Sequence, residues 1–64
     1  MLKNRLKECR EKSGMTQTAL AAKSGISRAT INKIENDEEA VLTTQTIAKL
    51  SEALGVVPSE IFLL

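Results

Sequence analysis

The chain has 64 residues, 42% of them hydrophobic, and Phe62 is its only aromatic residue. This length allows one small domain, residues 1–64, and the aliphatic composition favours packed helices over a sandwich of strands. One cysteine and no histidine exclude an intramolecular disulfide and an ordinary zinc site. We find no signal-peptide pattern and no apolar run of the ~20 residues that cross a membrane, so we expect a cytoplasmic protein without a cofactor.

The net charge of +1 is unevenly distributed along the chain. Residues 1–36 hold eight basic and three acidic side chains, whereas residues 37–64 hold one basic and five acidic side chains. A basic half is typical of proteins that bind a polyanion, although small domains also carry uneven charge by chance.

A first helix is predicted over residues 2–12. Leu2, Leu6 and Cys9 recur at the spacing of one helical face. Cys9 is expected to be a small buried hydrophobic residue of this helix. Gly14 suits the left-handed conformation that ends a helix.

Two further helices are predicted with only a short turn between them. Thr16 can cap a helix over 17–24, and Ser27 can cap one over 28–36. Gly25 ends the first of the two, and it can adopt the positive φ that a tight turn needs. Helices joined by so short a turn cross at a steep angle, which defines a helix-turn-helix.

The rest of the chain predicts a loop, a fourth helix and a short fifth one. After the loop 37–42, Thr43 or Thr44 caps a helix that continues to about Ala53. Pro58 keeps the preceding residue extended, and a last helical turn then begins with Ser59 as its cap. The expected fold is therefore all-α, with five short helices around one core.

The segment 17–36 satisfies the packing demands of a helix-turn-helix. Ala21 is small where the helices approach each other, and apolar residues fill the space between them (Leu20, Ile26, Ile31 and Ile34). Together with Arg10-Glu11-Lys12, Met15-Thr16-Gln17 and Ala53-Leu54-Gly55-Val56, this segment resembles the phage repressor/Cro family of helix-turn-helix regulators. The resemblance covers essentially the whole chain. It implies a compact lambda-repressor-like domain and a sequence-specific DNA-binding regulator of transcription that acts as a repressor.

The resemblance also implies roles for residues that match the family. The first turns of the recognition helix would read base edges in the major groove, through Ser27, Arg28, Ala29, Thr30 and Asn32. Phosphates would be held by Gln17, Lys33 and Asn36. Arg10 and Glu35 would form a structural ion pair. Alternatives remain: Arg28 and Lys33 as solvated charges, Thr30 as a spacer, Ser27 as a cap only, and Arg10 as a phosphate contact.

Two features depart from the family pattern. The loop after the recognition helix carries Asp37, Glu38 and Glu39 where basic residues usually meet the DNA backbone, and it is about one residue longer. Carboxylates near phosphates oppose binding, so this loop either points away from DNA or meets a partner. Ser24 is polar where an apolar residue is common.

The end of the chain suggests self-association. Residues 61–64 are all apolar, and one helix face cannot bury four consecutive side chains. We expect a homodimer on a near-palindromic operator, as the family implies, with its contacts made through Val57, Ile61, Phe62 and Leu64. The alternative is that Ile61 and Leu64 cover the core of one chain.

Two other functions compete with DNA binding. The same fold can be a protein-interaction module, such as an antitoxin or a subunit whose acidic loop contacts a partner. An enzyme is the weakest reading, because the sequence offers no histidine, metal-ligand cluster or glycine-rich phosphate loop. No small-molecule effector is evident.

Overall fold

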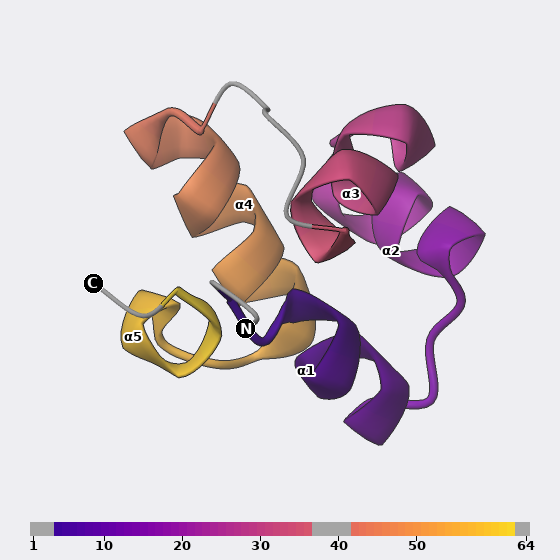
Figure 1. The fold of residues 1–64 in the computed structure, drawn as a ribbon, viewed down its shortest axis with the longest axis horizontal. Coiled ribbons are helices and arrows are strands. Elements are labelled where there is room, and N and C mark those ends of the chain that lie inside the picture. The colour runs from indigo at the N-terminus through magenta and orange to yellow at the C-terminus, as the bar shows by residue number, and fades with distance from the viewer. Residues whose placement is uncertain (1–3, 37–41, 63–64) are drawn as a thin grey trace.

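Five helices surround one apolar core in the computed structural model of the chain, which describes residues 4–36 and 42–62 (Figure 1). The helices are α1 (Leu6–Lys12), α2 (Gln17–Ser24), α3 (Arg28–Glu35), α4 (Thr44–Leu54) and α5 (Pro58–Ile61). Over these described ranges the only strand-like feature is an isolated antiparallel bridge between Asn4 and Phe62. The predicted all-α class is confirmed.

The first helix begins later than the sequence predicted. The backbone N–H of Arg5 donates a hydrogen bond of 2.7 Å to the carbonyl of Ile61, beside the bridge between Asn4 and Phe62. The Asn4 side-chain oxygen then accepts from the N–H of Leu6 at 2.9 Å. Residues 4 and 5 are therefore held beside the end of α5 rather than coiled into α1, and Leu2 lies outside the described residues.

Hydroxyl side chains start the three longest helices. Thr16, Ser27 and Thr43 each accept a hydrogen bond from the backbone N–H three residues later, at 3.0 to 3.2 Å. These bonds satisfy N–H groups that have no partner within the helix. The predicted caps at Thr16 and Ser27 are confirmed, and Thr43 rather than Thr44 caps α4.

The fifth helix begins one residue before the predicted cap. Pro58 occupies its first turn, where the missing N–H costs nothing and the fixed φ suits a helix. Ser59 thus lies inside α5, and Val57 precedes the helix without a side-chain cap bond. Proline geometry, rather than a hydroxyl cap, starts this helix.

Each helix contributes one fully buried large side chain to the core. These residues are Leu6, Leu20, Ile31, Leu50 and Ile61. Helix α2 packs against both α3 and α4, and α1 packs against α3 and α5. Because the inner face of α3 is held by this core, its opposite face is left at the surface.

The structure corrects part of the predicted dimer surface. Ile61 is 0% exposed and Phe62 only 5% exposed, so both are core residues of a single chain. The bridge to Asn4 and the short helix α5 fold the end of the chain inward. Val57 is 56% exposed, and Leu64 lies outside the described residues.

None of the helices that the structure describes is both long and apolar enough to cross a membrane.

Candidate nucleic-acid interface

Helix α3 presents one polar face to solvent and buries the other. Ile31, Ile34 and Glu35 are buried against the rest of the domain. Six of the predicted DNA-contact residues are exposed: Ser27, Arg28, Ala29, Asn32, Lys33 and Asn36. Thr30 is half-buried. The predicted base-reading and phosphate-binding side chains of this helix therefore lie on one accessible surface.

The turn before α3 fixes where this surface begins. Gly25 has a φ of 76° in the left-handed region, and its N–H donates to the carbonyl of Ala21 at 2.9 Å. Ser27 then caps α3, and its hydroxyl also donates to Thr30 Oγ1 at 2.8 Å. Both hydroxyls at the start of α3 are thus engaged with each other, which orders the first turn of the helix.

A buried ion pair joins α1 to α3. Arg10 Nε lies 2.7 Å from Glu35 Oε2, and Arg10 Nη2 donates to Glu35 Oε1 at 3.2 Å, which makes the pair bidentate. The two side chains are 11% and 2% exposed. Hydrogen bonding to Glu35 raises the pKa of the Arg10 guanidinium despite the opposing effect of burial. Arg10 Nη1 donates to the carbonyl of Met15 at 2.8 Å, so this guanidinium is turned inward, as the structural reading expected.

Gln17 extends this pair to the exposed face of α3. Its Nε2 atom donates to Glu35 Oε1 at 3.0 Å and to Asn32 Oδ1 at 3.2 Å. Asn36 Nδ2 donates to the same Asn32 oxygen at 3.3 Å. The structure therefore links four residues that the sequence assigned to three separate roles: Gln17, Asn32, Glu35 and Asn36.

Sequence reasoning missed most of these contacts. The four-residue spacing of Asn32 and Asn36 could have predicted their contact within one helix. The bond from Gln17 to α3 had no such signal, since it depends on how α2 and α3 cross. Asn4 Nδ2 also donates to the carbonyl of Ile34 at 2.8 Å, which ties the start of the chain to the end of α3.

The polar residue Ser24 has a structural explanation. Ser24 is buried at the end of α2, and its hydroxyl accepts from the N–H of Ile26 at 3.2 Å. This bond satisfies a backbone group of the turn, so a hydroxyl replaces the apolar side chain common here in the family.

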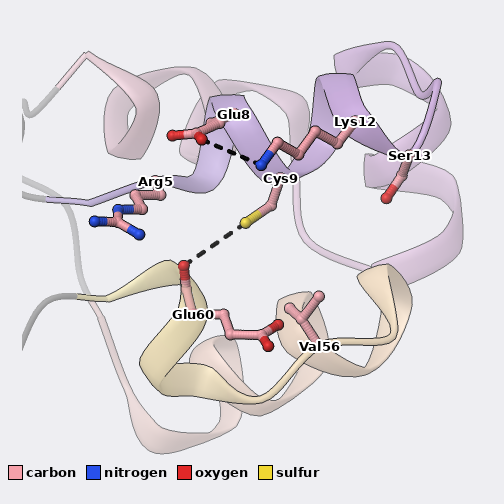
Figure 2. Close-up of a pocket in the computed structure, with 7 residues that line it drawn as sticks. All are labelled: Arg5, Glu8, Cys9, Lys12, Ser13, Val56 and Glu60. Carbon is pink, nitrogen blue, oxygen red and sulfur yellow. Dashed lines mark hydrogen bonds and ion pairs between the residues drawn. The ribbon is translucent and has the colours of Figure 1, made fainter.

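A shallow hollow lies away from α3, between α1 and the end of the chain. Figure 2 shows its lining, and its volume is about 340 Å³. Cys9 is half-buried rather than fully buried, and its Sγ lies 3.7 Å from the carbonyl oxygen of Glu60. Glu8 pairs with Lys12 at 3.4 Å on the rim. In the described part of the chain, no three metal-ligating residues come together.

Two further predictions fall outside the described residues. The acidic loop positions 37–41 and the apolar position Leu64 have no described structure. Leu42, the last residue of the predicted loop, is exposed.

Three features define a helix-turn-helix domain. They are a short turn in which Gly25 adopts the left-handed conformation, the following helix α3, which Ser27 caps, and the exposed polar face of that helix. The helix-turn-helix family matches residues 6–62, and the chain belongs to this family in its repressor/Cro-type form. The chain is 43% identical over 51 residues to the HTH-type transcriptional repressor RghR of Bacillus subtilis (strain 168). That match covers 80% of this chain but only 38% of the relative.

Two solved structures share the fold. The restriction-modification controller protein C.AhdI from Aeromonas hydrophila superposes with a TM-score of 0.80 at 34% identity, covering 88% of this chain and 83% of that one. A chain of the SinR protein/SinI protein complex also gives 0.80, at 28% identity, covering 91% of this chain and 56% of that one. Helix-turn-helix domains of this type are regulators of transcription rather than a class of enzymes.

Proposed function

We propose that the chain binds double-stranded DNA sequence-specifically as a transcriptional repressor, with the start of α3 in the major groove. The observation that carries this proposal is the exposure of Arg28 and its neighbours on α3, while Ile31 and Ile34 anchor the opposite face in the core. A recognition helix needs this division, since its leading side chains must reach base edges without loosening the domain. The relation to a repressor supports the same reading.

Base reading and phosphate binding are assigned to different parts of the surface. Base edges are read from the first turns of α3 by Ser27, Arg28, Ala29, Thr30 and Asn32. Phosphates are held by Gln17, Lys33 and Asn36. Both hydrogens of the Gln17 side-chain amide are donated within the protein, so Gln17 would hold a phosphate through its backbone N–H at the start of α2, together with the neighbouring N–H groups of that helix.

Substitution of Arg28 and Lys33 tests this assignment. A binding site is first selected from a random DNA pool, and affinities are then measured by fluorescence anisotropy on the selected site and on random DNA. Arg28→Ala should lose about 1–3 kcal/mol on the selected site and little on random DNA, because a bidentate contact to a base carries sequence information. Lys33→Ala should weaken both and reduce the salt slope by about 1.

An equal loss on both DNAs for Arg28→Ala would contradict its role as a base reader. Failure of the unaltered protein to enrich any site would contradict the proposed function as a whole.

We further propose that the protein acts as a homodimer on a near-palindromic operator, in the cytoplasm of a bacterium or of a phage-infected cell. Two-fold symmetry would place two copies of α3 one DNA turn apart, about 34 Å. Val57 is the exposed apolar residue that supports a contact near the end of the chain.

A protein-interaction module with the same fold is the second candidate. One structural neighbour comes from a complex of two proteins, SinR and SinI, and the sequence after α3 carries Glu38 and Glu39, whose carboxylates would oppose phosphates. If Arg28→Ala left cellular function intact while changes at Glu38 and Glu39 abolished it, partner binding would be the main role. An enzymatic role has no support in this family, and we propose none.

A further inference from the structure

The carboxylate of Glu35 sets the direction of a hydrogen-bond chain that ends at the DNA-facing surface. An ionised carboxylate accepts hydrogen bonds and cannot donate them. Glu35 Oε1 receives one bond from Arg10 Nη2 and one from Gln17 at 3.0 Å. The group that Gln17 turns toward Glu35 must therefore be its NH₂ group.

The same NH₂ group fixes the next residue. Gln17 Nε2 has a second hydrogen, which it donates to Asn32 at 3.2 Å. The receiving atom must be the side-chain oxygen, since an NH₂ group there would set two donors against each other. Asn36 Nδ2 donates to the same oxygen at 3.3 Å. Both lone pairs of Asn32 Oδ1 are therefore occupied from within the protein.

Only the nitrogen of Asn32 is left to meet a ligand. Its side chain is exposed, and none of the residues in the described ranges accepts a hydrogen bond from Asn32 Nδ2. Turning this amide over would place its NH₂ group against those of Gln17 and Asn36 and break two hydrogen bonds. The protein thus holds Asn32 as a donor.

The bases differ in what they offer such a donor. Guanine presents two acceptors in the major groove, N7 and O6, and thymine presents O4, whereas adenine presents N7 beside its N6 amino group, which is itself a donor and opposes Asn32 Nδ2. An asparagine that selects adenine must both donate to N7 and accept from N6. With its oxygen occupied, Asn32 cannot make this paired contact.

Resting on the proposed function, we propose that Gln17 and Glu35 position Asn32 as a donor-only reader, which selects guanine or thymine over adenine at one base pair. Glu35 and Gln17 act through Asn32 and are positioning residues. Asn36 reinforces the arrangement from within α3.

Site selection with three proteins tests this proposal. Binding sites are selected from a random DNA pool with the unaltered protein, Asn32→Ala and Gln17→Ala. The base pair that loses its preference in Asn32→Ala identifies the position that Asn32 reads. There the unaltered protein should prefer guanine or thymine over adenine by about 10-fold, the ratio that corresponds to one good contact of ~1.4 kcal/mol.

Gln17→Ala should reduce that ratio to about 3-fold or less, because Asn32 then keeps only the bond from Asn36, whose exposed amide can turn with it, and Asn32 can accept from adenine N6. The ratios at other base pairs should stay unchanged. Loss of a phosphate contact alone would lower affinity for all sites equally and leave every ratio intact. Thermal unfolding of each variant checks that it is folded at the assay temperature.

A chemical probe needs no variant at all. Where guanine is selected, 7-deazaguanine replaces its N7 acceptor by carbon and should weaken binding of the unaltered protein. Where thymine is selected, 5-methyl-2-pyrimidinone, which lacks the O4 acceptor, should do the same. Asn32→Ala should be insensitive to either analogue.

Three results would overturn the inference. These are a preference for adenine or cytosine at the pair read by Asn32, an unchanged ratio in Gln17→Ala, and no altered preference in Asn32→Ala. If the unaltered protein selected no site, the proposed function would fail with it, and that result is separate because it appears before any variant is compared.

Discussion

At the scale of single residues, Glu35 connects the stability of the domain to its outer surface. It accepts hydrogen bonds from Arg10 and from Gln17 while it is almost fully buried. A buried carboxylate is costly unless it is paired and hydrogen-bonded, so these partners are needed as a set.

Removing one partner of this pair should be more harmful than replacing both. Arg10→Ala or Glu35→Ala should lower the free energy of unfolding by about 3–5 kcal/mol, because each strands a buried charge. The double variant Arg10→Met/Glu35→Leu should lose less than the two single losses added together, since no charge is left unpaired. Urea denaturation followed by circular dichroism measures all three, and additive losses would argue against a coupled pair.

The ion pair could be predicted from the sequence, whereas the hydrogen bonds that link Gln17 to Glu35 and Asn32 could not. The pairing of Arg10 with Glu35 was predicted from the resemblance to a family, since a separation of 25 positions gives no spacing signal. The bonds from Gln17 to Asn32 and Glu35 depend on a few ångströms in the crossing of α2 and α3. Local sequence rules describe single helices and cannot fix that geometry.

At the scale of helices and turns, the sequence predicts the features whose stabilising hydrogen bonds lie within a few residues. Thr16 and Ser27 could be identified as caps because the bond that each makes spans only three residues. The start of α1 could not be predicted, because residues 4 and 5 are held by backbone partners at 61 and 62. A contact across nearly the whole chain has no signature in a short window of sequence.

The stability of the turn between α2 and α3 should depend on the backbone conformation of Gly25 rather than on the room available for a side chain there. A Cβ atom at this position would meet nothing within 4 Å, while φ is +76°. Gly25→Ala should therefore cost about 1–2 kcal/mol of unfolding free energy, the penalty of a left-handed conformation for an L-residue. Gly25→Asn should cost less, because asparagine tolerates this region.

Thermal or urea unfolding of the two variants measures the difference. Equal losses for alanine and asparagine would indicate that something other than the φ angle limits this turn.

At the scale of the whole molecule, the core and the surface near the end of the chain have separate roles. Ile61 is fully buried with one large residue from each other helix, and Val57 four residues earlier is exposed. The sequence showed four consecutive apolar residues but not which of them the fold would cover. The structure buries Ile61 and Phe62, and the bridge between Asn4 and Phe62 lies beside them.

Substitutions at these two positions should separate self-association from folding. Val57→Glu should leave the free energy of unfolding of the monomer within about 0.5 kcal/mol, as surface changes do, and weaken the proposed dimer. Ile61→Ala should instead cost about 2–5 kcal/mol of unfolding free energy, because it leaves a cavity in the core. Sedimentation equilibrium measures association, and an unchanged dimer in Val57→Glu would place the interface elsewhere.

The burial of Phe62 has a consequence for spectroscopy. Its phenyl ring is the only one in the chain and lies in the core cluster. The magnetic field of an aromatic ring shifts the NMR signals of methyl groups that pack on its faces. Strongly displaced methyl resonances in this protein must therefore come from neighbours of one ring, so they would report the undocking of residues 58–62 from the core without any label.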